Sequence, residues 1–289
     1  MRLGSEDAEK VFSFVTEGMP IILLDSESTP IFRSEIQPSS SEIGAPAISA
    51  KAALVSDLDT GGIILDKNAG DVLPIASLTK LMTATVASEL IYLGRSIVID
   101  GAMLKDAIQS YPLKMGERVQ AFDLLYPLLM ESSNGAARAL AAFMGERYFL
   151  SQMKAKAMTL SMKDTDFEDP AGIGDGNKST LKDLAKLSKY ILDKRRFIFD
   201  VGKGEDFRFF GVNTLSGIKN YNEFAGGKNL VGMKNGGTET AGQTILTVWK
   251  MKDRRGDSRN IFIGILGSED RVRDVEAARA WLKAVFGLE

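Results

Sequence analysis

Hydrophobic and polar positions divide this chain into strand-like runs near both ends and helical runs between them. Two apolar runs, 52–57 and 63–66, flank the turn-forming residues 59–62, a pattern typical of a β-hairpin. Three later runs also predict strands: 229–234, 243–251 and 260–266. The predicted helices, which show helical spacing of apolar residues or are apolar nearly all round, are 79–93, 123–130, 136–144, 146–158, 179–194 and 271–286.

This order of elements predicts an α/β protein of the α+β type, in which early and late strands form one antiparallel sheet. A helical lobe, over about residues 77–195, would be inserted into that sheet. Residues 1–45 form a lead-in, with a short strand predicted at 21–24 and a Ser/Pro-rich linker at 34–46. The domain would span 46–289. The last helix would pack on the sheet through Val275, Ala278, Trp281, Leu282 and Val285.

The amino-acid composition excludes several kinds of catalytic and binding site. The 289 residues include no His and no Cys, which excludes thiol catalysis, disulfides, zinc sites and His-dependent triads, so we expect no metal and no cofactor. The net charge is -2, and the densest basic segment, 250–259, is interrupted by acids; it predicts a solvated turn between two strands and no nucleic-acid site. No run is long enough for a membrane span, and no signal peptide is visible.

Ser77 and Lys80 open the most apolar of the predicted helices. A polar pair in that place needs a reason, because burying a lysine charge is costly. Three other Ser-x-x-Lys pairs are explained by an amphipathic surface, an N-cap and a loop, respectively: Ser151/Lys154, Ser179/Lys182 and Ser216/Lys219.

Catalysis supplies that reason. Three residues apart on a helix, Lys80 and Ser77 face the same side, so the amine can take the serine proton if it is neutral near pH 7. Its free pKa is about 10.4. Burial and a second cation, for which Lys234 is the candidate, would both lower it. The start of the helix also offers the Ser77 backbone N–H to a developing oxyanion.

Ser132-Ser133-Asn134-Gly135 separates two predicted helices. The Ser132 hydroxyl could pass a proton between Lys80 and a leaving amine, and Asn134 could hold an amide carbonyl of the substrate. A plainer interpretation is the end of one helix followed by the N-cap of the next, for which Ser, Asn and Gly are common. Taken alone, this segment favours the plainer interpretation.

Lys234-Asn235-Gly236-Gly237 ends a predicted strand. A strand edge without bulky side chains lets a peptide bind alongside as an added strand. The Gly237 N–H could complete an oxyanion hole, and Lys234 with Asn235 could bind a terminal carboxylate. A turn that ends the strand explains the segment equally simply.

Together the three segments resemble the S-x-x-K, S-x-N and K-T/S-G elements of the penicillin-recognising serine acyl-transferases. The sequence is similar to the low-molecular-mass D-alanyl-D-alanine carboxypeptidases over about residues 46–289, and the resemblance implies their β-lactamase/DD-peptidase-like fold. The segments that carry the similarity are 57–61, 74–84, 123–125, 132–140, 165–167, 169–173, 179–185 and 232–242.

The resemblance implies that Ser77 is acylated, Lys80 is the general base, and the Ser77 and Gly237 amides form the oxyanion hole. The last D-alanine of a peptidoglycan stem peptide would leave through an acyl-enzyme, β-lactam antibiotics would be covalent inhibitors, and the protein would be extracytoplasmic, in the periplasm or at the cell surface. The site residues implied are catalytic Ser77, Lys80 and Ser132, and substrate-binding Asn134, Lys234, Asn235, Gly236 and Gly237.

The sequence departs from the family pattern in two places. Asn235 replaces a Thr or Ser, and an amide can donate to a carboxylate but cannot relay a proton, which predicts weaker turnover. The chain also ends after the last predicted helix, without the family's usual C-terminal β-domain and amphipathic anchor.

Two alternatives stay open at this point. A serine β-lactamase of the same fold needs a carboxylate that activates the deacylating water; Glu168 lies in the right region but lacks the Glu-x-x-Leu-Asn pattern. A non-catalytic cell-wall-binding module is suggested by Asn235, although retention of the other motif residues argues against it. Labelled penicillin distinguishes the three functions. A stable adduct indicates the carboxypeptidase, rapid turnover indicates the β-lactamase, and the absence of an adduct indicates the binding module.

Overall fold

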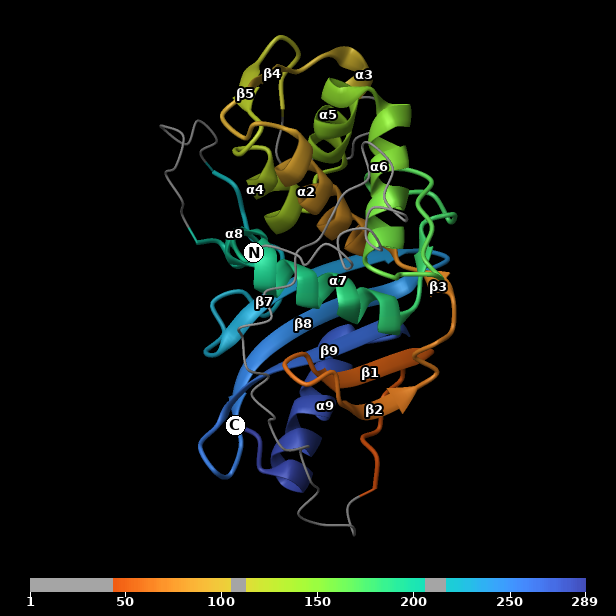
Figure 1. Cartoon of the computed structure of the whole chain (residues 1–289), viewed down its shortest axis with the longest axis vertical. Helices are drawn as coiled ribbons and strands as arrows, with labels where there is room; N and C mark the ends of the chain where they lie inside the picture. Colours follow the sequence, from red (N-terminus) through yellow and green to blue (C-terminus); the bar gives the residue numbers. More distant parts are fainter. Residues whose placement is uncertain (1–43, 105–112, 206–216) are drawn as a thin grey trace, which may run out of the picture. The chain divides into compact units, whose positions relative to one another are not determined.

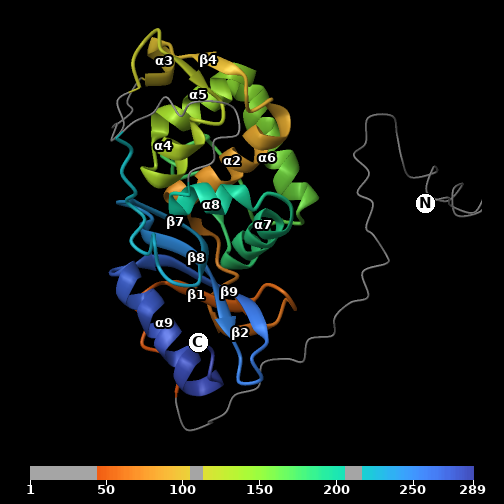
Figure 2. The ribbon, with the colours of Figure 1, turned by 90° about the vertical axis from the view of Figure 1, so that its left-hand side faces the viewer.

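The computed structural model describes residues 44–104, 113–205 and 217–289, all within one compact unit, Glu35–Glu289. The predicted strand at 21–24, most of the predicted linker and Ser216 lie outside the described residues. One five-stranded antiparallel sheet carries a helical lobe on one face and a single long helix on the other (Figures 1 and 2). The predicted α+β fold class is therefore confirmed.

The sheet joins the two ends of the described chain, in the strand order β2-β1-β9-β8-β7. Every neighbouring pair in it is antiparallel, and β7 forms one edge. Each strand predicted within the described residues is present, and the charged turn predicted between two strands connects β8 to β9. The bounds are β1 Ala52–Asp57, β2 Ile63–Lys67, β7 Leu230–Thr238, β8 Gly242–Lys252 and β9 Ser258–Ser268.

Alternating residues of the central strands serve two separate cores, because successive side chains of a strand point to opposite faces. On β9, Ile261, Ile263 and Ile265 pack against α9 (Arg271–Phe286), whereas Phe262 and Leu266 belong to the core of the helical lobe. Both faces are covered, so these strands are apolar throughout rather than alternating. Helix α9 has the bounds that the sequence predicted.

The helical lobe is built around α2, Thr79–Leu90, which contacts α4, α5, α6 and α8. Burial on all sides explains why this helix is apolar nearly all round; it ends at Leu90 rather than at the predicted residue 93 because Ile91 is extended. The other helices of the lobe are η1 Ala76–Leu78, α3 Gly101–Leu104, α4 Leu125–Met130, α5 Asn134–Met144, α6 Glu146–Thr159, α7 Leu181–Lys194 and α8 Phe197–Lys203.

Two short ladders were not predicted, β3 (Leu73–Pro74) with β6 (Lys178–Ser179) and β4 (Ser96–Val98) with β5 (Arg118–Gln120). They correct one expectation. Ser179 pairs in β6 with Leu73, and the N-cap of α7 is the next residue, Thr180, whose hydroxyl accepts the N–H of Asp183.

Candidate active site

Ser77 lies in a strained turn between the β3 strand and helix α2. Ala76, directly before it, has a φ of +48°, a left-handed conformation that is unfavourable for a residue with a Cβ. The turn is held by the Thr79 hydroxyl, which donates to the Ala76 carbonyl at 2.8 Å, and by the Ile75 N–H, which donates to Asn177 O at 3.0 Å. Strain of this kind is retained where the surroundings fix it, and here it presents a half-buried Ser77 at the start of the helix.

Lys80 lies one turn further along and is fully buried. Three oxygens surround its Nζ: Ser77 Oγ at 2.8 Å, Asn134 Oδ1 at 2.9 Å and the Ala171 carbonyl at 2.5 Å. Two of these, the amide and peptide oxygens, can only accept. A neutral amine has two N–H groups for these oxygens and one lone pair for the serine hydroxyl. An ammonium that donates to all three oxygens and a neutral amine that accepts the Ser77 O–H both fit this geometry.

The electrostatics favour that neutral amine. Burial, and next the nearby charge of Lys234, lower the pKa of Lys80 well below its ordinary value, while Asp169 acts in the opposite direction. Lys234 is fully buried as well, and burial together with Arg271 lowers its pKa to about 7, against the effect of Glu223. The predicted influence of Lys234 on Lys80 is thus present in the structure.

The second motif connects α4 to α5 and serves two purposes. Ser133 accepts the Ala136 N–H at 3.2 Å and is the N-cap of α5, as the plainer interpretation proposed. Asn134 then turns its side-chain oxygen to Lys80. Ser132 has a φ of +61°, and its buried hydroxyl has no hydrogen-bond partner among the described residues. The structure therefore brings Asn134 to Ser77 and Lys80, but it forms no contact between Ser132 Oγ and Lys80.

The third motif lies on β7, the edge strand, as expected for a strand that adds a peptide. A Cβ at Gly236 would lie 2.8 Å from both the Ser77 backbone nitrogen and Thr244 Oγ1. A glycine at this position therefore lets β7 approach the turn that carries Ser77. Gly237, next along, is exposed.

Asn235 is engaged within the protein. Its Nδ2 donates to Tyr221 O at 2.9 Å and to Glu223 Oε2 at 2.8 Å, and its Oδ1 accepts from Lys234 Nζ at 3.2 Å. Of the two side chains expected to bind a substrate carboxylate, Asn235 therefore already donates to an internal carboxylate, whereas Lys234 donates to oxygens of Asn235. Glu223 also accepts from Arg271 Nε at 2.7 Å. The sequence predicts no role for Glu223 or Arg271, because neither belongs to a motif.

Asp169 organises the loop that supplies the third oxygen around Lys80. Its carboxylate accepts backbone N–H groups of Ala171 and Gly172 at 2.7 Å and of Gly174 at 2.8 Å. These bonds hold the Ala171 carbonyl against the Lys80 amine. The segment carried the family resemblance, but a backbone oxygen has no signature of its own in a sequence.

A substitution at Gly172 tests whether the turn that carries Ser77 depends on its contact with this loop. Gly172 has a φ of +77°, and a Cβ there would lie 2.0 Å from the Ala76 carbonyl oxygen. Gly172→Ala is expected to displace the Ser77 turn, lowering the unfolding free energy by about 3 kcal/mol and the acylation rate by about 100-fold. Denaturant unfolding and labelled-penicillin kinetics measure both.

Gly145→Ala is the matched control, because Gly145 has a φ of +86° but open space around its Cβ position. The backbone strain alone, at a φ of +86° and a ψ of +114°, is expected to cost about 2 kcal/mol, without any effect on acylation. Equal losses in the two variants would contradict a specific contact between Gly172 and the Ser77 turn.

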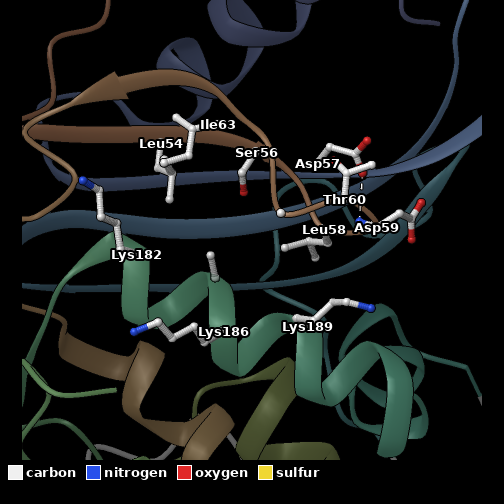
Figure 3. A pocket seen from close by; sticks show the side chains of 12 residues that line it. Leu54, Ser56, Asp57, Leu58, Asp59, Thr60, Ile63, Lys182, Lys186 and Lys189 are labelled. Carbon is white, nitrogen blue, oxygen red and sulfur yellow. Dashed lines mark hydrogen bonds between the residues drawn. The ribbon is translucent and has the colours of Figure 1, made fainter. Parts of the chain in front are cut away.

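The cleft with a volume of about 570 Å³ shown in Figure 3 lies elsewhere, between the β1–β2 turn and α7. None of the motif residues lines it. Three lysines of α7 border it, and each forms an ion pair with an aspartate: Lys182 with Asp66, Lys186 with Asp183, and Lys189 with Asp193. The lysines of this cleft are therefore already paired and do not by themselves indicate a reaction.

Within residues 44–104, 113–205 and 217–289, no cluster of side chains is suited to a metal ion, and no helix has the length and apolarity to cross a bilayer.

Comparison with solved structures shows the same fold in a D-alanyl-D-alanine carboxypeptidase and in a penicillin-binding protein. The D-alanyl-D-alanine carboxypeptidase of Mycobacterium tuberculosis H37Rv superposes with a TM-score of 0.73 at 25% identity, covering 86% of this chain and 95% of that one. Penicillin-binding protein D2 of Listeria monocytogenes, in its ampicillin-bound form, gives a TM-score of 0.71 at 25% identity, covering 82% and 98%.

Comparison of sequences leads to the same group. A D-alanyl-D-alanine endopeptidase of Pseudomonas aeruginosa is 29% identical, over 82% of this chain and 78% of its own length. DacD, a D-alanyl-D-alanine carboxypeptidase of Escherichia coli, is 31% identical over 82% of this chain, which spans 63% of DacD; the chain likewise spans 60% of DacF of Bacillus subtilis. The Peptidase_S11 family model, described as D-alanyl-D-alanine carboxypeptidase, matches residues 39–258. The predicted family is therefore confirmed, and the chain belongs to the Peptidase_S11 family of D-alanyl-D-alanine carboxypeptidases.

Proposed function

We propose that this protein is a serine-type D-Ala-D-Ala carboxypeptidase that removes the terminal D-alanine of peptidoglycan stem peptides through an acyl-enzyme. The observation that carries the proposal is the fully buried Lys80 amine at 2.8 Å from Ser77 Oγ, with its pKa lowered by burial and by Lys234. A neutral amine in this position is the base that a serine nucleophile needs in a chain without histidine.

In the acylation step, Lys80 takes the proton of Ser77 as Oγ bonds to the carbonyl carbon of the penultimate D-alanine. The backbone N–H groups of Ser77 and Gly237 donate hydrogen bonds to the carbonyl oxygen as it becomes negatively charged. The C–N bond then breaks, and the leaving amine takes the proton from Lys80 by way of Ser132, whose hydroxyl must first turn toward Lys80 in the substrate complex. Water afterwards hydrolyses the ester and restores Ser77.

Ser132 suits this relay. Its hydroxyl is buried and unpaired among the described residues, and its backbone has a φ of +61°. An unsatisfied buried hydroxyl and a strained backbone both cost stability, and they are often retained at functional sites. In this proposal Ser132 supplies a mobile proton next to the leaving group, whereas Asn134 orients both Lys80 and the substrate amide.

Substrate binding would use the edge of β7. A peptide added along this strand lies beside Ser77, because Gly236 brings the strand close to the Ser77 backbone. Lys234 and Arg271 lie next to it and provide positive charge for a carboxylate. We also propose reaction with β-lactams, since the Listeria relative of this fold is described with ampicillin and with cefotaxime bound. An extracytoplasmic location follows from the peptidoglycan substrate.

A β-lactamase receives less support. Its deacylating carboxylate would be Glu168, but this side chain is exposed and accepts the Gly176 N–H at 2.9 Å in the loop before β6. A non-catalytic module does not require two buried lysines around a serine, which are costly to keep without a reaction.

The decisive experiment incubates the protein with a stem pentapeptide and follows the products by mass spectrometry. We expect the loss of a single alanine from the C-terminus and a long-lived adduct with labelled penicillin. Rapid penicillin hydrolysis would favour the β-lactamase, and the absence of both an adduct and alanine release would favour the binding module.

A further inference from the structure

Glu223 occupies the position in which the proposed function needs a substrate carboxylate. Its Oε2 accepts from Asn235 Nδ2 at 2.8 Å, and its Oε1 accepts from Arg271 Nε at 2.7 Å and is paired with Nη2 of the same guanidinium. The side chains of Glu223 and Arg271 are only 26% and 21% exposed, respectively. An internal carboxylate thus takes up the donors beside Lys234.

The loop that carries Glu223 is anchored to helices α4 and α8. Tyr221 N–H donates to Met130 O at 3.0 Å, at the end of α4. The buried Asn222 donates from Nδ2 to Leu129 O at 3.1 Å and to Gly202 O, in α8, at 2.9 Å. Glu223 follows these anchors directly, so its carboxylate is positioned by backbone contacts and is not a loose surface group.

Arg271 is fixed from the other side. It is the first residue of α9, its backbone N–H donates to Gln243 Oε1 at 3.1 Å, and its Nη1 donates to Gly236 O at 2.6 Å. The guanidinium therefore lies against the β7 strand with Glu223 on its outer side. A guanidinium is a strong carboxylate receptor, and here two of its nitrogens, Nε and Nη2, contact one oxygen, Oε1, of a carboxylate that comes from the protein itself.

We infer that Glu223 is a specificity-determining residue of the proposed reaction, which disfavours leaving groups with a free carboxylate relative to leaving groups whose carboxyl is amidated or absent. The inference rests on the proposed function, because it assumes that the leaving group lies next to Lys234 and Asn235. A free carboxylate must either displace Glu223 from Arg271 and Asn235 or bind beside a like charge. A carboxamide brings no charge and meets neither obstacle.

The test compares two blocked peptides that end in D-Ala-D-Ala, one as the free acid and one as the carboxamide. For Glu223→Gln, at about pH 6, we expect the KM of the acid to fall about 10-fold while that of the carboxamide stays within about twofold. Glu223→Ala should show the same split. The low pH limits loss of the charge on Lys234, whose pKa of about 7 is raised by Glu223.

Glu239→Gln is the matched control, since Glu239 is exposed on the turn between β7 and β8 and its loss changes the net charge equally. It should alter neither substrate. A KM for the acid that is unchanged or raised in both Glu223 variants, or an equal change for acid and carboxamide, would overturn the inference.

The wild-type protein separates this outcome from a failure of the proposed function. If the wild type neither reacts with labelled penicillin nor cleaves either peptide, the proposed function fails. If it does both and the Glu223 variants show no difference between the two peptides, only the role of Glu223 is wrong. Thermal unfolding of each variant verifies that it is folded.

Discussion

Ser77→Ala is expected to abolish the penicillin adduct and to reduce D-alanine release by about 10,000-fold or more. Alanine removes the hydroxyl that lies 2.8 Å from the Lys80 amine, and the ester intermediate can then no longer form. The fold should persist, because Lys80 keeps its bonds to Asn134 and to the Ala171 carbonyl. Mass spectrometry measures both effects, the release of D-alanine from the peptide and the mass of the protein after incubation with labelled penicillin.

Ser151→Ala is the control for this variant, because Ser151 and Lys154 have the same spacing as Ser77 and Lys80. Ser151 lies on the exposed side of α6, where its hydroxyl donates to Tyr148 O at 2.6 Å, and Lys154 is paired with Asp166. We expect no change in activity. Substantial alanine release by Ser77→Ala would show that another group is the nucleophile.

Much of the fold could be predicted because its elements have strong periodic patterns. The apolar stripe of α9 and the long runs of β8 and β9 are determined by burial against the sheet and the two cores, so their positions follow from the residues alone. The ladders β3–β6 and β4–β5 are two or three residues long. So short a strand has no period, and its pairing depends on contacts between segments distant in sequence.

The same reasoning explains which site residues could be found. Ser77, Asn134 and Lys234 lie at element ends or on an edge strand, and each is a polar residue next to apolar sequence. The contact of the Ala171 carbonyl with Lys80 and that of Glu223 with Arg271 depend on how two loops fold back, one against α2 and the other against the start of α9. Such contacts arise from tertiary packing, and no local pattern of side chains encodes them.

Lys80→Arg is the second variant with a large expected effect, a loss of about 1,000- to 10,000-fold in acylation. A guanidinium cannot become neutral in a protein, so it cannot take the Ser77 proton. It is also too large for a fully buried site in which three oxygens lie within 2.9 Å of the amine. Because this change could unfold the lobe, Lys80→Met serves as a neutral second variant of similar length.

Lys154→Arg is the control for these two variants, as its side chain is half exposed and lies on the surface of α6. It should retain full activity. If Lys80→Met folds and still reacts with penicillin at a rate close to that of the wild type, Lys80 is not the base.

The pH profile of the wild-type protein tests the same amine without any mutation. Lys80 must be neutral to act, and its pKa lies well below the ordinary lysine value, so kcat/KM should rise as the pH increases through that lowered pKa. Lys234 must be protonated to attract a carboxylate, and with a pKa of about 7 it loses its charge above neutrality, so the KM of a free-acid substrate should then rise. The free acid should therefore give a bell-shaped profile of kcat/KM against pH, whereas the carboxamide should lack the alkaline decline.

Two outcomes would contradict these assignments. An alkaline decline of equal size for both substrates would show that the decline comes from a group other than Lys234. A profile that does not rise with pH on the acid side would show that proton transfer to Lys80 does not limit the reaction.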